Sequence, residues 1–195
     1  MINEEESIDI YRSSFEYFQK LEKSIAVHLG LPKLKSGGVT IRNEKGWREN
    51  EKSIEYIWIV EMARSFVGWG GLFTIKFSKN EFREHSNEEE LIQGVFISND
   101  NEAVNFYTES LLGTSPEIIN LFNLNLFDAN KGITLDGVSY KVRIIAPNIN
   151  TFINVHNPNT DSWKKWEAEI WKIGNRLAED SNNIELKNLF EHQNN

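Results

Sequence analysis

Residues 54–77 read IEYIWIVEMARSFVGWGGLFTIKF, two apolar runs joined by a segment rich in glycine. The first run, residues 54–62, is apolar on both faces in its middle, which is typical of a central strand covered on both sides. The second run, residues 72–78, alternates aromatic or aliphatic with polar side chains, which predicts a strand with one exposed face. Together the two runs predict a β-hairpin.

The connection between these strands contains three glycines, Gly68, Gly70 and Gly71. A phosphate-binding loop would need a following lysine and Ser/Thr, and a dinucleotide loop would have to open into a helix. Here the glycines lead into a strand, so no helix N-terminus is available to hold an anion. We therefore predict a hairpin turn or bulge, in which glycine supplies a positive φ.

Six tryptophans occur in the chain, and packing in the core is the ordinary role of such residues. Trp69 lies among the glycines of the hairpin, where its indole either folds back on the sheet, as is more common, or stays exposed as a binding anchor. Trp47 lies in the polar segment EKGWREN. We predict that Trp47 and Trp69 are the two indoles most suited to bind a partner at the surface.

Helical periodicity marks both ends of the chain. Apolar residues at three- and four-residue steps predict an N-terminal helix that ends at Gly30. A second apolar stripe, between Trp163 and Leu177, predicts a C-terminal helix from about residue 161. Trp171 lies off this stripe, and we expect it to be partly exposed.

A third helix is predicted in the middle of the chain, over residues 99–113. Asn99 and Glu102 have the spacing of a capping box, and Ala103, Phe106 and Tyr107 follow at helical spacing. Further along, Asp136-Gly137 lies between alternating apolar residues and predicts a second hairpin.

This order of elements predicts one α+β domain over residues 1–195, with flexible ends at 1–7 and 192–195. We expect a mostly antiparallel or mixed sheet of about six to eight strands, packed by an N-terminal, a middle and a C-terminal helix.

Composition excludes several classes of function. The net charge is −8 and no basic run occurs, which argues against nucleic acid as a partner. There is no basic segment followed by an apolar stretch and no apolar run of the ~20 residues that a membrane span needs, so we expect a cytoplasmic protein with no membrane association. The chain has no cysteine, which excludes disulfides and thiolate metal sites.

No catalytic motif is found. The four histidines lie far apart and lack metal-ligand spacing: they are His28, His85, His156 and His192. His28 is expected to pack near the end of the first helix, favoured there by the helix dipole. No G-x-S-x-G elbow occurs. We expect no metal, no cofactor and a non-enzymatic role.

Two acidic runs remain, Glu4 to Glu6 and the run Glu88, Glu89 and Glu90. Such runs usually form solvated surface, but the second, together with the two tryptophans, is a candidate surface for a basic protein partner. In being small, acidic, cysteine-poor and without catalytic motifs, the chain resembles bacterial immunity proteins in character. Two alternatives stay open: a small-molecule binder or enzyme with an aromatic-lined pocket, and an assembly component that forms a homo-oligomer.

Overall fold

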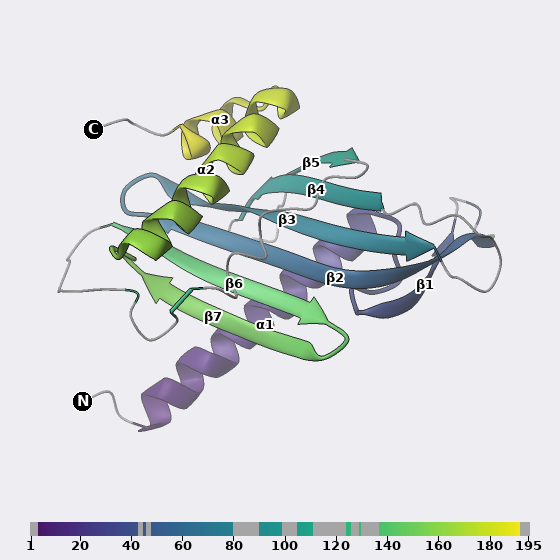
Figure 1. Ribbon diagram of the computed structural model, residues 1–195, viewed down its shortest axis with the longest axis horizontal. Coiled ribbons are helices and arrows are strands. Elements are labelled where there is room, and N and C mark those ends of the chain that lie inside the picture. The colour runs from purple at the N-terminus through teal and green to yellow at the C-terminus, as the bar shows by residue number, and fades with distance from the viewer. Residues whose placement is uncertain are drawn as a thin grey trace.

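The structure is a computed structural model that describes residues 4–42, 45, 48–79, 90–98, 105–110, 124–125, 129 and 137–191. In these residues it confirms the α+β class, with seven strands in one sheet and three helices (Figure 1). The strands are β1 (Gly37–Arg42), β2 (Arg48–Arg64), β3 (Gly68–Lys79), β4 (Glu90–Ile97), β5 (Asn105–Ser110), β6 (Val138–Ala146) and β7 (Ile149–His156). The helices are α1 (Glu4–His28), α2 (Asp161–Ser181) and α3 (Ile184–Phe190).

The strand order is β5-β4-β3-β2-β6-β7, and β1 pairs with β2 beside this path. All of these pairings are antiparallel. The predicted central hairpin is confirmed: β2 and β3 pair from Lys52 and Lys79 as far as Arg64 and Gly68, and residues 65–67 make the turn. The strand predicted after Asp136-Gly137 is β6, although Asp136 itself lies outside the described residues.

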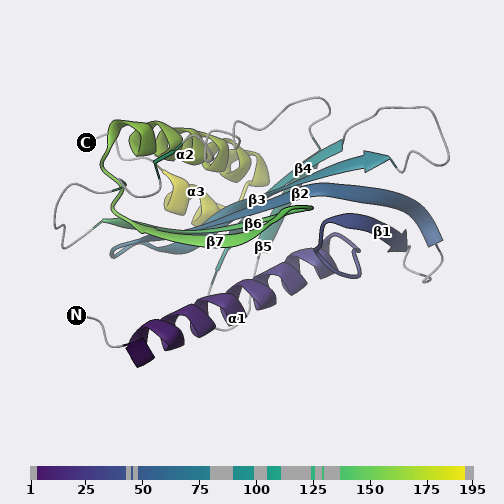
Figure 2. The ribbon, with the colours of Figure 1, turned by 60° about the horizontal axis from the view of Figure 1, so that its bottom comes forward.

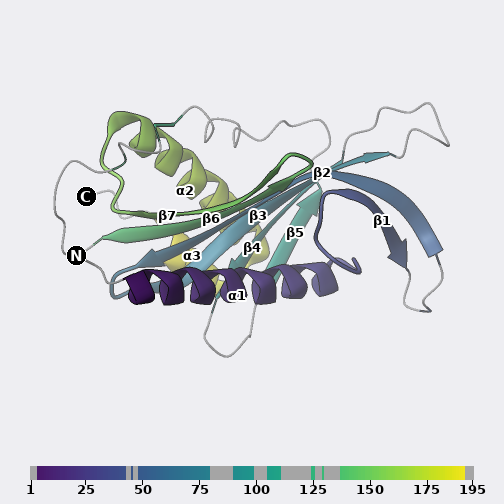
Figure 3. The ribbon, with the colours of Figure 1, turned by 90° about the horizontal axis from the view of Figure 1, so that it is seen from below.

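The helices cover both faces of the sheet. Figure 2 shows α1 against one face and α2 with α3 against the other, and Figure 3 shows α1 lying across the strands. Side chains of β2 alternate between the two layers, since Trp58 and Val60 pack in the cluster under α2 and Ile57 and Ile59 in the cluster under α1. This confirms the prediction that the first run is a strand covered on both sides.

The prediction that one face of β3 is exposed is wrong at the centre of the strand, whereas the polar positions further along it are half-buried. Thr74, expected to face solvent, is 0% exposed, and its neighbour Leu72 packs in the cluster under α2. Phe73 and Ile75 pack on the opposite face under α1. The alternation in the sequence is real, but the second helical layer also covers Thr74, because β3 lies next to β2 in the middle of the sheet.

The predicted middle helix is also wrong where the structure describes it. Residues 105–110 form β5, which pairs with β4 from Ile97 and Asn105 to Ile92 and Ser110. Phe106 has a tilted ring contact with Phe96 at 6.3 Å between centroids. The aromatic and β-branched residues NFYT suit a strand as well as a helix, and the free edge of β4 offers the hydrogen bonds that decide between the two.

Trp171 on α2 is 4% exposed, which corrects the prediction of partial exposure. Its indole Nε1 donates a hydrogen bond of 2.8 Å to the hydroxyl of Tyr140 on β6, and that hydroxyl donates to the carboxylate of Glu167. Burial raises the pKa of Tyr140 strongly, and the neighbouring Glu167 carboxylate adds to the shift. Trp171 is therefore held in the core by its hydrogen bond to Tyr140, a contact that the helical periodicity of the sequence does not reveal.

This shift gives a testable pH dependence. Because the folded pKa of Tyr140 is raised, the phenol stays protonated in the native state above pH ~10, where an unfolded tyrosine ionises. The Tyr140 contribution to stability is therefore present below pH ~10 and falls as the pH rises beyond it. In a spectrophotometric titration of the folded protein up to pH ~11, Tyr140→Phe is expected to give the same tyrosinate absorbance as the wild type. A smaller absorbance change in the variant would contradict this.

One of the three hairpin glycines has the predicted role, and the other two do not. Gly68 has a φ of +131°, as expected for the turn, but Gly70 and Gly71 lie within β3. A Cβ on Gly70 would lie 1.9 Å from the Leu189 side chain on α3, and one on Gly71 would lie 2.1 Å from the Val60 carbonyl oxygen. These two glycines therefore permit close packing of α3 and β2 on β3.

Candidate functional site

The strongest exposed apolar feature among the described residues is the end of the β2–β3 hairpin. Phe66 is 99% exposed, Val67 50% and Trp69 45%. We call these three residues the hairpin-end patch. The indole of Trp69 does not fold back completely onto the sheet, so Trp69 remains a candidate anchor. Phe66 and Val67, close to it in the chain, are exposed as well.

Phe66 has an unusual backbone for its residue type, with a φ of +65°. The left-handed region is unfavourable for a bulky aromatic residue and costs of the order of 1 kcal/mol or more. The surrounding turn is held by Ser65, whose amide donates to the carbonyl of Gly137 at 3.1 Å, and by the Val67 amide, which donates to Arg64 at 3.2 Å. The fold thus holds a strained turn in which the phenyl ring is presented to solvent.

An open cleft of about 380 Å³ lies between the hairpin and α3. Its lining combines aliphatic side chains with one carboxylate, and consists of Val67, Gly68, Trp69, Ile97, Ser98, Glu185, Asn188 and Leu189. Glu185 is exposed in the first turn of α3, and Ile184 beside it is 67% exposed. The cleft therefore offers apolar walls and a negative charge at the same place.

Arg64 fixes α3 beside the hairpin. Its Nη1 donates to the carbonyl oxygens of Glu191 at 3.1 Å and Leu189 at 3.4 Å, at the C-terminal end of α3. The guanidinium also lies 5.3 Å from the ring centre of Trp171. Cationic donors satisfy the free carbonyls at a helix end, so this contact sets the position of α3 and with it one wall of the cleft.

The acidic run and Trp69 do not come together. Glu90 begins β4 opposite Phe77, and its carboxylate pairs with Lys52. Trp69 lies eight residues from Phe77 along β3, which is about 26 Å at the usual rise of a strand. Glu88, Glu89 and Trp47 lie outside the described residues. Of the predicted partner surface, the two described residues, Trp69 and Glu90, therefore lie far apart along the sheet, and the charge of Glu90 is already partnered.

Sequence reasoning missed Phe66, Val67 and Glu185. A signal for the first two was present, because the turn between two apolar strands reads Ser-Phe-Val where polar turn residues are usual. Glu185 could not be found in this way, since only the contact of α3 with the hairpin brings it to the cleft.

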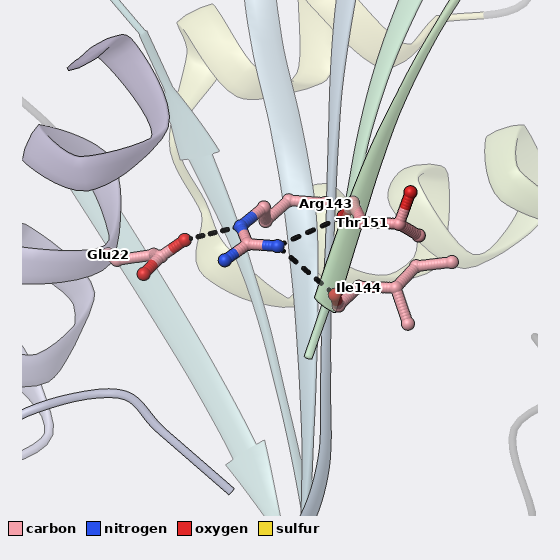
Figure 4. Close-up of polar contacts among 4 residues, drawn as sticks. All are labelled: Glu22, Arg143, Ile144 and Thr151. Carbon is pink, nitrogen blue, oxygen red and sulfur yellow. Dashed lines mark hydrogen bonds and ion pairs between the residues drawn. The ribbon is translucent and has the colours of Figure 1, made fainter. Parts of the chain in front are cut away.

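Buried charge occurs elsewhere, under α1. Arg143 on β6 is 7% exposed, and its Nε donates to Glu22 of α1 at 2.7 Å (Figure 4). Its Nη1 donates to the carbonyl oxygens of Ile144 at 3.2 Å and Thr151 at 3.0 Å. These contacts occupy the guanidinium with protein partners, which assigns Arg143 to holding α1 on the sheet.

The two described histidines, His28 and His156, lie in separate surroundings. His28 lies against Phe106 with ring centres 4.4 Å apart, and burial lowers its pKa, opposite to the expected effect of the helix dipole. His156 Nδ1 hydrogen bonds with the hydroxyl of Ser139 at 2.8 Å. Within the described part of the chain, no three His, Asp or Glu side chains gather in a group that could hold a metal ion.

None of the helices in the described ranges is long and apolar enough to cross a membrane. Comparison of the chain with protein-family models, with curated proteins and with solved structures found no match.

Proposed function

We propose that this protein is a non-catalytic binding module for a basic protein, and that the hairpin-end patch with the adjoining cleft is its contact surface. The exposed aromatic residues serve as anchors, and the cleft accepts a lysine or arginine side chain of the partner. The chain's resemblance in character to bacterial immunity proteins, which neutralise other proteins by binding them, agrees with this role.

The observation that carries the proposal is Phe66, which is 99% exposed at a φ of +65°. A soluble protein gains nothing from an aromatic ring in a strained turn that contacts only solvent, whereas interfaces are enriched in aromatic anchors. Strain of this kind is maintained at sites of binding and is compensated by the surrounding fold. In this protein the long pairing of β2 with β3 compensates the backbone strain at Phe66.

The class of partner follows from the composition of the cleft. Lysine and arginine carry an aliphatic stem with a cationic head. The stem fits walls made by Val67, Ile97 and Leu189, and the head fits the carboxylate of Glu185. The net charge of −8 would also steer a basic protein toward the chain.

The test starts with affinity capture from the source organism's extract, after which the captured basic protein is purified and titrated by calorimetry. Phe66→Ser combined with Trp69→Ser is expected to weaken binding by about 100-fold or more, because central aromatic anchors dominate interface energy. Glu185→Lys is expected to weaken binding by about tenfold and to flatten its dependence on salt.

Val27→Ser is the matched control, because Val27 is 71% exposed but lies on α1, on the other face of the sheet. It should leave the affinity unchanged. A partner that binds the double serine variant as tightly as the wild type would refute the proposal. Self-association of the wild type that is lost in the double variant would instead identify a second copy of this chain as the occupant.

A further inference from the structure

A second feature, independent of the proposed function, is the outer edge of β7 (Ile149–His156). Among the described strands, β7 comes last in the strand order and pairs only with β6. The eight residue pairs between these two strands form a regular antiparallel ladder without a bulge. The sheet therefore ends on this side in a regular strand (Figure 1).

The backbone of β7 directs hydrogen-bonding groups outward. The Asn157 amide donates to the carbonyl oxygen of Val138 at 2.9 Å, which makes these two residues a hydrogen-bonded pair at the end of the ladder. Because hydrogen-bonded and non-hydrogen-bonded pairs alternate in an antiparallel ladder, Asn150 and Asn154 fall in non-hydrogen-bonded pairs. Their backbone N–H and C=O groups point away from β6, where no described strand pairs with them.

The sequence of β7 has none of the features that usually protect a sheet edge. Native sheets discourage pairing at an edge with charged side chains, proline or bulges. Residues 149–156 read INTFINVH, without Lys, Arg, Asp, Glu or Pro. Five of the eight are β-branched or aromatic residues, which favour strands. An edge of this composition is a template for pairing with a further strand.

The distribution of charge favours a second copy of the chain as the source of that strand. The net charge of −8 makes two copies repel each other in general. The β7 sequence carries no acidic or basic side chain other than His156, so two copies that meet at this edge bring no like charges opposite each other along the strands. A two-fold axis places the strand antiparallel to its own copy, which lets outward N–H groups of one copy meet C=O groups of the other.

We propose that this protein forms a symmetric dimer by antiparallel pairing of β7 with β7 of a second copy, and that this pairing joins the two sheets into one. A contact of this kind uses the same edge in both copies, so it closes at two chains and does not continue into a fibre.

The position of α1 (Glu4–His28) agrees with a sheet that continues past β7. Figure 1 shows the first turns of α1 beyond β7, outside the outline of the described strands. Figure 2 shows that the helix stays on one face of the sheet. Pairing at β7 about a two-fold axis perpendicular to the sheet puts both α1 helices on the same face. The first turns of each helix then extend over the β7 side of the other copy's sheet.

Mass and amide exchange of the full chain test this assignment. In sedimentation equilibrium between about 1 μM and 1 mM protein, we expect the mass to rise to twice the 22.6 kDa of one chain. At the upper concentration the amides of Asn150 and Asn154 should exchange slowly with solvent, because the pairing covers them. The Ile153 amide lies in a hydrogen-bonded pair with β6 in monomer and dimer alike, and it serves as the internal reference.

Asn154→Pro removes one outward donor without removing a bond to β6, a position where edge strands accept proline. We expect it to weaken dimerisation by about 30-fold, the effect of losing one hydrogen bond from each copy. The Asn150 amide should then exchange fast at concentrations at which the wild type protects it, while the Ile153 amide stays protected.

A pair of lysine substitutions tests the same edge without proline. Asn150→Lys with Asn154→Lys keeps the backbone and places like charges on both sides of the two-fold axis, so the chain should remain a folded monomer. Ser162→Lys with Ala168→Lys is the matched control, because it adds the same charge at exposed positions of α2, on the other face of the sheet. The control should dimerise like the wild type.

A wild-type mass of one chain or of more than two chains at about 1 mM would overturn the proposal. It would also be overturned by a dimer whose Asn150 and Asn154 amides exchange unprotected, or by a dimer that the Asn150→Lys, Asn154→Lys variant retains. Phe66→Ser with Trp69→Ser should keep the β7 dimer intact, so the hairpin-end patch and the β7 edge are tested separately.

Discussion

Replacing Arg143 with methionine is expected to lower the free energy of unfolding by about 3–5 kcal/mol, the cost of removing one partner of a buried ion pair. The guanidinium donates to Glu22 and to the carbonyls of Ile144 and Thr151, and the variant leaves all three acceptors without this donor. Glu22 is only 15% exposed, so water replaces the lost contact poorly. Urea unfolding followed by far-ultraviolet circular dichroism measures the change.

Lys172→Met is the matched control, because Lys172 is 77% exposed and its pair with Glu169 spans 3.6 Å on the surface of α2. Lys172→Met should lower the free energy of unfolding by less than about 0.5 kcal/mol. Combining Arg143→Met with Glu22→Leu should restore part of the stability, since no buried charge is then left unpaired. If Arg143→Met cost no more than Lys172→Met, the ion pair would not be what holds α1 on the sheet.

Replacing Gly71 with alanine is expected to lower the free energy of unfolding by about 2–3 kcal/mol through overpacking. The new Cβ would lie 2.1 Å from the carbonyl oxygen of Val60 and 2.6 Å from the ring of Phe96. The first contact is with the backbone of the central strand, which cannot move without disturbing its pairing with β6. Urea unfolding followed by far-ultraviolet circular dichroism measures this loss of stability as well.

Gly38→Ala provides the comparison within the same sheet. Gly38 lies on β1, and a Cβ there would have no atom within 4 Å. We expect a change within about 0.5 kcal/mol. Equal effects at the two positions would show that loss of glycine, and not the close approach of β2 and β3, determines the cost.

The central part of the fold was predictable because its information is local. The double-sided run at 54–62, the turn glycine Gly68 and the break at Gly30 are determined by neighbouring residues. The errors concern contacts between distant residues. Burial of Thr74 depends on a helical layer that begins at residue 161, and β5 forms because the edge of β4 is open.

The candidate site was predictable only in part. Trp69 could be selected from the sequence, because an indole between turn glycines is unusual. Trp69 and Glu185 line the same cleft only because α3 packs against Gly70, and this is a contact between residues more than a hundred positions apart.

The arrangement of helices on opposite faces of one sheet also affects how the chain emerges from the ribosome. The layer that covers Trp58 and Val60 is built by α2 and α3, whose residues are translated after every described strand. Until they appear, the nascent sheet presents a broad apolar surface on one side while α1 can already cover the other. Chaperone contacts and misassembly should therefore concentrate on this late-covered side, since transiently exposed apolar surface is what aggregates during synthesis.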